Sequence, residues 1–271
     1  MTQPHSDPQT LPDRAMLESW IPTLESLIRR AGDVVMAVYA EDIEVDSKAD
    51  QSPVTRADRD AEAVILEGLA RLGSGCPVVA EEAVAAGHIP ATGRCFWLVD
   101  PLDGTREFIS RNGEFTVNIA LIADGVPVLG LVLAPALERL FVGGPGLGAW
   151  MDAGAGRQPI QVREVPPAGL TVVASRSHGD AAALDAFLEG RRVAQVVGAG
   201  SSLKLCLLAQ GEADVYPRLG RTMEWDIAAG QAVLLGAGGQ VNALTGEALA
   251  YGKPGFENPH FVAWARSPAG A

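Results

Sequence analysis

The chain has 271 residues, 48% of them hydrophobic, and a net charge of −12. This is enough apolar sequence for one large core or for two closely packed ones. Because no basic patch is present, the composition excludes a nucleic-acid-binding surface. It does not exclude a phosphorylated substrate, since a bound metal reverses the local field of an acidic pocket.

Cysteine usage and apolar runs predict a cytoplasmic protein. Cys76, Cys95 and Cys206 are odd in number and include no Cys-x-x-Cys pair. This predicts a reducing compartment, no disulfide framework and no cysteine zinc site. Residues 1–13 have no apolar signal-peptide core. The longest apolar stretch, from Val126 to Leu137, contains two prolines and is too short to cross a bilayer.

The first half of the chain predicts two helices and then a sheet. Apolar residues recur at helical spacing from Asp13 to Ala40, with Asp13 as the N-cap. We expect Pro22 to kink this helix or to mark its true start. A second amphipathic helix is predicted over 57–72. Strands are predicted at 76–80, 96–100, 115–123, 127–134 and 139–143. Their short connections favour an antiparallel or mixed sheet.

From Gly169 onward strands and helices alternate, which is typical of an α/β arrangement. The pattern predicts strands at 170–174, 192–197 and 213–216, with helices at 180–189 and 201–211 between them. A small-residue helix at 226–237, a hairpin at 238–250 with a turn at Thr245-Gly246, and a strand at 260–265 follow. Pro166-Pro167 is the best internal boundary, so we divide the chain into 1–166 and 167–271.

The run Trp-Leu-Val-Asp-Pro-Leu-Asp-Gly-Thr-Arg-Glu-Phe at 97–108 carries the strongest chemical signal. Asp100 and Asp103 follow an apolar strand and offer the hard oxygen ligands that Mg²⁺ prefers. Gly104 lets the backbone approach a ligand, and a helix beginning near Thr105 would turn its N–H groups toward an anion. The run predicts a divalent metal beside a phosphate. The alternative is an Asp-rich turn without a ligand.

Other acids could join this site. Glu81-Glu82 ends a predicted strand, so Glu81 would meet Asp100 and Asp103 if the two strands are neighbours. The alternative is a pair of solvated glutamates. Asp226 would cap its helix, supply a fourth carboxylate, or do both. Asp58 is either an ordinary first-turn acid or the partner of the Thr105 hydroxyl in activating a metal-bound water.

Residues 198–202 read Gly-Ala-Gly-Ser-Ser between a strand and a helix. They lack the third glycine of a dinucleotide site and the Gly-Lys-Ser/Thr of a P-loop, which excludes both. The helix start with its two serines, Ser201 and Ser202, followed by Lys204, could still form an anion site. Lys204 alone is interpreted as a solvated helix lysine. His178 and Arg218 are either exposed side chains or phosphate contacts.

Taken together, four motifs in this order resemble the Mg²⁺-dependent, lithium-sensitive phosphatase superfamily of inositol monophosphatase. They are Thr-x-Ala-Asp at 55–58, Glu81-Glu82, Asp-Pro-Leu-Asp-Gly-Thr at 100–105, and Trp-Asp-x-Ala-Ala-Gly at 225–230. Residues 96–108, 111–120, 200–204 and 213–218 are similar to the bacterial CysQ-type 3′(2′),5′-bisphosphate nucleotidases of that superfamily. Arg106 stands where those proteins usually have Lys.

The resemblance implies a layered α/β fold of alternating helices and sheets, with two to three Mg²⁺ ions. One ion would be held by Glu81, Asp100 and the Leu102 carbonyl, and a second by Asp100, Asp103 and Asp226. A third, weaker ion would lie near Glu81. The resemblance further assigns water activation to Asp58 and Thr105, phosphate binding to the amides of Gly104 and Thr105, and nucleotide contacts to His178, Ser201, Lys204 and Arg218.

The implied reaction is hydrolysis of adenosine 3′,5′-bisphosphate to AMP and phosphate. Inositol-specific members carry a carboxylate where this chain has Leu219, which weakens an inositol interpretation. A broad inositol-phosphate or fructose-1,6-bisphosphate phosphatase is the alternative. A non-catalytic sensor of nucleotide and metal is a third hypothesis. Homodimers are common among such relatives, and no self-complementary patch in the sequence decides the oligomeric state.

Overall fold

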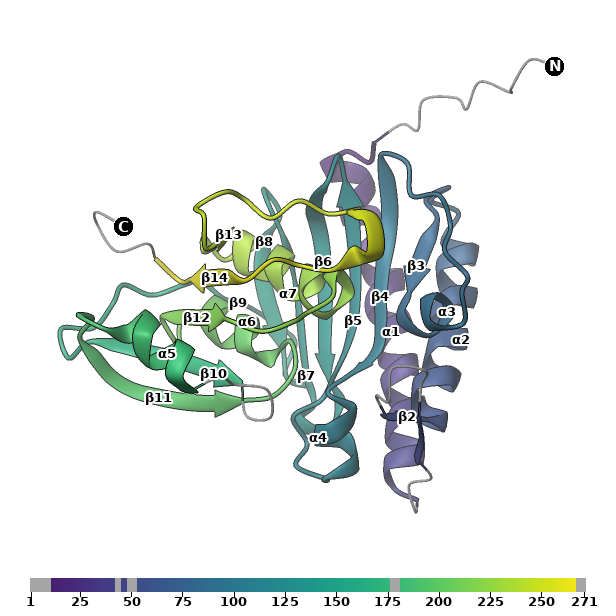
Figure 1. The fold of residues 1–271 in the computed structure, drawn as a ribbon. Helices are drawn as coiled ribbons and strands as arrows, with labels where there is room; N and C mark the ends of the chain where they lie inside the picture. Colours follow the sequence, from purple (N-terminus) through teal and green to yellow (C-terminus); the bar gives the residue numbers. More distant parts are fainter. Residues whose placement is uncertain (1–10, 42–44, 48–52, 176–180, 267–271) are drawn as a thin grey trace.

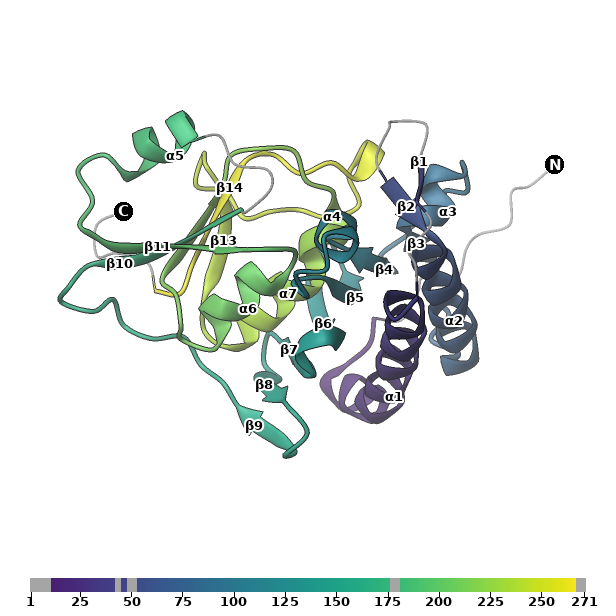
Figure 2. The same cartoon turned by 90° about the horizontal axis from the view of Figure 1, so that it is seen from below.

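Helices and sheets alternate in five layers (Figures 1 and 2). Helices α1 (Arg14–Tyr39) and α2 (Arg56–Leu72) cover one face of a seven-stranded sheet. Helices α6 (Leu203–Ala209) and α7 (Glu224–Gly236) lie between this sheet and a five-stranded one, and α5 (Ala181–Leu188) lies outside the second sheet. The computed structural model describes residues 11–41, 45–47, 53–175 and 181–266. The layered α/β prediction is confirmed.

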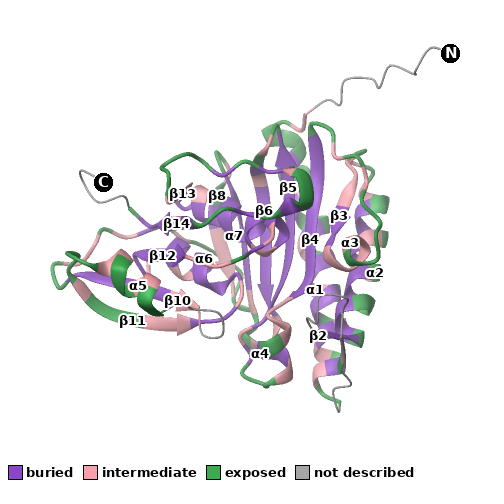
Figure 3. Cartoon of the chain, viewed as in Figure 1, coloured by how far each residue is buried: buried purple, intermediate pink, exposed green. Residues whose placement is uncertain are grey.

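The first sheet is mixed, as expected. Its order is β3-β4-β5-β6-β7-β8-β9, with β3 parallel to β4 and every later pair antiparallel. The strands are β3 (Val78–Ala80), β4 (Cys95–Asp103), β5 (Thr116–Ala123), β6 (Val126–Ala134), β7 (Arg139–Gly144), β8 (Gly148–Asp152) and β9 (Arg157–Pro159). Figure 3 shows that β4, β5 and β6 are buried over most of their length.

Helix α1 begins where the sequence predicts. The Asp13 Oδ1 accepts a hydrogen bond from the Met16 N–H at 2.8 Å, which caps the helix. Pro22 lies inside the helix, so the expectation that it could mark the start was wrong. The apolar stripe of α1 packs with that of α2 against the sheet, in a core that includes Leu24, Ile28 and Ile65.

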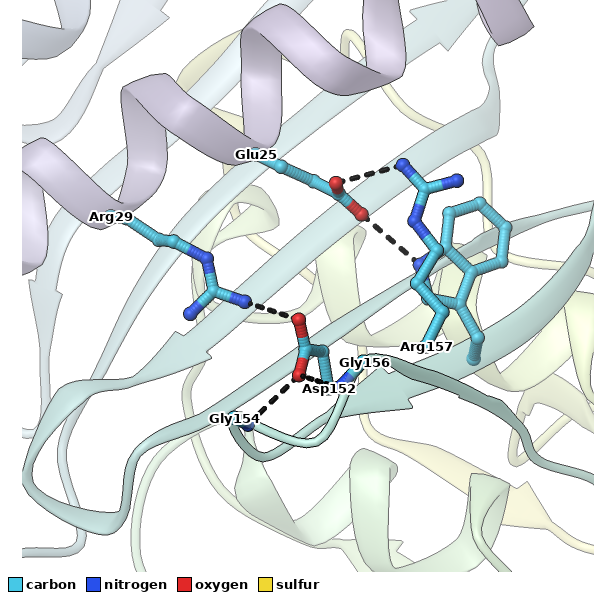
Figure 4. A network of polar contacts seen from close by, with 7 residues as sticks. Glu25, Arg29, Asp152, Gly154, Gly156 and Arg157 are labelled. Carbon is cyan, nitrogen blue, oxygen red and sulfur yellow. Dashed lines mark hydrogen bonds and ion pairs between the residues drawn. The ribbon is translucent and has the colours of Figure 1, made fainter.

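The β8–β9 hairpin was not predicted, and polar contacts tie it to α1 (Figure 4). Arg29 Nη2 lies 2.9 Å from Asp152 Oδ2, and Arg157 Nη2 lies 2.8 Å from Glu25 Oε2. Asp152 Oδ1 also accepts the backbone N–H groups of Gly154 and Gly156, which holds the turn. These strands are short and partly exposed, so apolar periodicity gave no signal for them.

The second sheet has the order β11-β10-β12-β14-β13. Its strands are β10 (Leu170–Ser175), β11 (Val193–Ala199), β12 (Val215–Arg218), β13 (Gln240–Ala243) and β14 (Phe261–Trp264). The predicted hairpin at 238–250 is reduced to β13, a turn closed by Gly246 N–H to Ala243 O, and a bridge between Asn242 and Ala248. The partner of β13 is β14, which lies later in the chain.

Helix α7 belongs by sequence to the second part but packs on the first sheet. A Cβ built on Gly130 of β6 would lie 2.2 Å from the Ala229 carbonyl oxygen, so only glycine permits this approach. The helix begins at Glu224 rather than at Asp226. Asp226 therefore does not occupy the N-cap position. It lies in the first turn, where its Oδ2 accepts the Met223 N–H at 2.8 Å.

The remaining elements are short. They are β1 (Val45–Ser47), β2 (Pro53–Thr55), α3 (Glu81–Ala85), α4 (Thr105–Ile109) and the 3₁₀ turns Pro135–Leu137 and Pro254–Phe256. Helix α3 was not predicted from the sequence. None of the described helices combines the length and apolarity that a membrane span requires.

The expectation of no disulfide was wrong. Cys76 and Cys95 are joined by a disulfide with a Cα–Cα distance of 5.5 Å. The two cysteines are 19 residues apart in sequence. Cys76 lies just before β3, and Cys95 is the first residue of β4. The parallel pairing of these strands, which Cys spacing could not reveal, brings them together. Cys206 is buried and free.

Candidate active site

Two parallel strands deliver the acids to one place. Ala80 of β3 pairs with Val99 of β4, so Glu81 and Asp100 follow at the same edge of the sheet. Asp103 at the end of β4 and Asp226 in the first turn of α7 line the same cavity of about 640 Å³. The predicted convergence of the acids is confirmed as geometry, and Asp226 joins them as the fourth carboxylate.

Burial and mutual repulsion disfavour charge on Asp100, Asp103 and Asp226. Burial raises the pKa of Asp100 well above its usual value, and the nearby Glu81, Asp103 and Asp226 raise it further. Burial and the neighbouring Asp103 raise the pKa of Asp226 in the same way. Burial raises the pKa of Asp103 to about 6, although Lys204 opposes the shift. A cation in the cavity would relieve this repulsion.

The residues that line the cavity fit Mg²⁺, because they offer oxygen ligands. These are the carboxylates and the backbone carbonyl of Leu102 near the end of β4. In the described part of the chain, no three carboxylate, imidazole or thiol groups already lie close enough to hold an ion together. The acids would therefore have to move toward a bound ion. Buried hydroxyls of Ser201 and Thr222, both lining the cavity, have no hydrogen-bond partner among the described residues.

We expect Mg²⁺ to stabilise the fold measurably. At a concentration about 100 times its Kd, a ligand specific for the native state adds about 2.7 kcal/mol to the free energy of unfolding. For a chain of this size that corresponds to a rise in Tm of roughly 5–10 °C. Thermal denaturation with Mg²⁺, with a chelator, and with NaCl at matched ionic strength measures this. An equal Tm in all three would contradict the metal assignment.

Asp58 contacts Thr105, which lines the cavity. Thr55 donates its N–H and its hydroxyl to Asp58 Oδ2, each at 2.8 Å. This capping box leaves Asp58 Oδ1 facing the Thr105 hydroxyl at 3.4 Å. Gly104 adopts a φ of +89°, which lets α4 begin at Thr105. Asp58 is thus a first-turn acid that also contacts Thr105, while the activation of a metal-bound water by this pair stays a prediction.

Ser202, which the sequence offered only as one of two serines at a helix start, contacts Asp103 and Asp226. Its hydroxyl lies 3.2 Å from Asp103 Oδ2 and 2.5 Å from the backbone carbonyl oxygen of Asp226. The hydroxyl therefore connects the end of β4 with the start of α7. Ser202 is almost fully buried. The only sequence signal was its place in the Gly-Ser-Ser run, which does not distinguish Ser202 from Ser201.

Two buried cations share the cavity with the acids. Lys204 is buried, its Nζ donates to the Ser201 carbonyl oxygen at 2.5 Å, and it lies 5.5 Å from the centre of the Tyr216 ring. Burial lowers its pKa to about 8, although the Asp103 carboxylate opposes the shift. The interpretation of Lys204 as a solvated helix lysine was wrong. Arg218 is also buried, and its Nη2 donates to the Arg221 carbonyl oxygen at 2.7 Å.

The remaining predicted residues are placed as follows. Leu102, Gly104 and Ser201 line the cavity. Helix α6 begins at Leu203, two residues after the predicted start, and Ser201 has a φ of +44°. His178 lies outside the described residues. Further cavity residues that we did not anticipate are Glu107, Ser175, Tyr216, Arg221, Thr222 and Met223.

A layered fold with a carboxylate cavity between its sheets is that of metal-dependent phosphatases of the inositol monophosphatase class. Residues 16–267 match the inositol monophosphatase family, and the chain belongs to this family. It is 48% identical over 238 residues to the 3′(2′),5′-bisphosphate nucleotidase CysQ of Salmonella typhimurium, covering 87% of this chain and 95% of that protein. The protein of the same name from Escherichia coli K12 is 47% identical over the same coverage.

Solved structures agree with the sequence relatives. The crystal structure of CysQ from Bacteroides thetaiotaomicron, a bacterial member of the family, matches with a TM-score of 0.77 and 35% identity, covering 94% of this chain and all of that one. An inositol monophosphatase of Thermotoga maritima matches with a TM-score of 0.75 and 26% identity, covering 91% and 92% of the two chains. The resemblance drawn from the four sequence motifs is confirmed.

Proposed function

We propose that this chain is a Mg²⁺-dependent phosphomonoester hydrolase that converts adenosine 3′,5′-bisphosphate to AMP and phosphate. One observation carries the proposal: a single cavity is lined by Glu81, Asp100, Asp103 and Asp226 together with the buried cations Lys204 and Arg218. A substrate with two phosphates matches both the carboxylates and the cations. One phosphate would lie beside the carboxylates and their Mg²⁺ ions, and the other beside the two cations. The CysQ relatives at 47–48% identity support this substrate class.

The carboxylates are assigned to two or three Mg²⁺ ions. Glu81, Asp100 and the Leu102 carbonyl would hold one ion, and Asp100, Asp103 and Asp226 a second, with a weaker third beside Glu81. When bound, Mg²⁺ would supply a water of lowered pKa and offset the charge on the leaving oxygen. Ser202 would keep Asp103 and the start of α7 at a fixed separation, since its hydroxyl contacts both.

Thr105 and Asp58 are assigned to proton transfer. As water attacks the phosphorus, Thr105 would accept a proton from it and pass its own hydroxyl proton to Asp58 Oδ1, which lies 3.4 Å away. The bond from phosphorus to the 3′-oxygen breaks, and that oxygen takes a proton from solvent. The backbone amides of Gly104 and Thr105 would hold the phosphate during the attack. Thr55 keeps Asp58 oriented through its two hydrogen bonds.

The nucleotide contacts are assigned to Ser201, Lys204, Arg218 and His178. Lys204 and Arg218 would bind the 5′-phosphate, because both are buried cations on the cavity wall. Ser201 brings a buried hydroxyl that has no partner within the described part of the chain. His178 enters on the resemblance alone.

Phosphate release from three substrates tests the proposal. Adenosine 3′,5′-bisphosphate, inositol 1-phosphate and fructose 1,6-bisphosphate are each assayed with Mg²⁺ and with a chelator. We expect a Mg²⁺-dependent preference for the nucleotide. Preference for a sugar phosphate would keep the metal site but replace the substrate with that of the broad-specificity alternative. Tight nucleotide binding without release from any substrate would favour the sensor hypothesis.

A further inference from the structure

Two polar residues interrupt the apolar face of β5 that packs toward α7. Ala120 and Ile122 lie in the core shared with α7, while Val117, Ile119 and Leu121 lie in the core shared with α1 and α2. Strand alternation therefore puts Thr116 and Asn118 on the α7 side. Asn118 is 1% exposed and Thr116 is fully buried. This face is buried rather than open to solvent.

These polar groups are unsatisfied. Neither Oδ1 nor Nδ2 of Asn118 has a hydrogen-bond partner among the residues that the structure describes, and the same is true of Thr116 Oγ1. A buried donor or acceptor without a partner costs about 1–3 kcal/mol. A leucine at position 118 would avoid that cost and continue the apolar row. The amide therefore lowers the stability of the protein as it stands, which calls for a functional reason.

The strand register points to that reason. In the antiparallel pair β4–β5, Asn118 lies directly opposite Asp100, and Thr116 lies opposite Asp103. Directly opposite residues share a face, with Cβ atoms about 4.5–5.5 Å apart. Each unsatisfied group thus lies beside one of the carboxylates assigned to the metal. Asp100 Oδ1 accepts the Leu102 N–H at 3.0 Å, and the Asp100 carboxyl also has a side-chain hydrogen bond with Glu81. Neither contact involves Asn118.

We propose that Asn118 is a positioning residue for Asp100. When a divalent cation binds, Asn118 Nδ2 donates a hydrogen bond to the Asp100 carboxylate, directly or through one buried water, and holds it toward the ion. This rests on the metal site of the proposed function. Outer hydrogen bonds of this kind orient ligating carboxylates, and their loss typically weakens metal affinity by about 10–100-fold. The amide is unsatisfied only until the cation draws Asp100 into place.

The test compares metal affinity with the stability of the metal-free protein. We expect Asn118→Leu to weaken the Mg²⁺ Kd by about 10–100-fold in calorimetric titration. We expect the Tm of the metal-free protein to stay the same or rise, because the unsatisfied amide is gone. Asn118→Ser keeps a donor and room for a water, so most of the affinity should remain. Gln210→Leu is the matched control, since it also removes a buried amide nitrogen without a partner in the described chain, but outside the cavity.

The opposite pattern would overturn the inference. A lower Tm without metal and an unchanged Mg²⁺ Kd would show that Asn118 serves packing alone. If Asn118→Leu does not fold, Asn118→Val gives the same comparison with a smaller side chain suited to a strand. A wild-type protein that binds no Mg²⁺ would defeat the metal assignment and this inference with it. Mg²⁺ binding by the wild type with no response to the position 118 variants would defeat this inference alone.

Discussion

Replacing Asp103 by asparagine is expected to abolish phosphate release and leave the fold intact. Asparagine keeps the shape of the side chain but removes the charge that Asp103 would offer to the second proposed ion. A bound metal supplies several kcal/mol of transition-state stabilisation, so the expected loss in kcat is roughly 10³-fold or more. The Tm of the metal-free protein should not fall, because burial and Glu81 already disfavour the charge on Asp103.

The measurements on this variant are kcat for phosphate release and the rise in Tm that Mg²⁺ produces. The stabilisation by Mg²⁺ should shrink along with kcat. Asp124→Asn is the matched control, since Asp124 is an exposed carboxylate paired with Arg94 away from the cavity. Its kcat and its Mg²⁺ response should equal those of the wild type. Near-normal turnover by Asp103→Asn would remove Asp103 from the metal site.

Replacing Thr105 by valine is expected to lower kcat by about 10²–10⁴-fold, the usual contribution of a positioned proton-transfer group. Valine has nearly the same shape but no hydroxyl to pass a proton to Asp58, which lies 3.4 Å away. The Mg²⁺ Kd should change little, because Thr105 is not among the carboxylates that line the cavity. This separates proton transfer from metal binding.

Asp58→Asn should act in the same way. The asparagine oxygen can still accept the two hydrogen bonds of Thr55, so the cap of α2 is kept while the proton acceptor is lost. Ser110→Ala is the matched control, because it removes a hydroxyl from the end of the same short helix as Thr105, outside the cavity. A normal kcat in both Thr105→Val and Asp58→Asn would exclude this pair from proton transfer.

Local pattern predicted most of the elements because it depends on near neighbours. The positions of the apolar residues along the chain predict the helical spacing of α1 and α2 and the buried strands of the first sheet. They also predict the alternation of strands and helices after Gly169. The short elements β8, β9 and α3 carry no such signal, since they bury few side chains. Pro22 does not mark the start of α1, because the packing of this long helix outweighs the one backbone hydrogen bond that proline cannot donate.

By itself, the sequence determined which chemical groups are present and which of them stand where strands and helices begin or end. Asp100, Asp103, Glu81 and Asp226 were recognisable on that basis, and the motif order identified the family. Tertiary structure alone decided contacts between residues far apart in the chain. Ser202 reaches Asp103 across 99 positions, Cys76 meets Cys95, and Lys204 becomes buried. Asn118 faces Asp100 only because of strand register, and register is set by packing that no local pattern records.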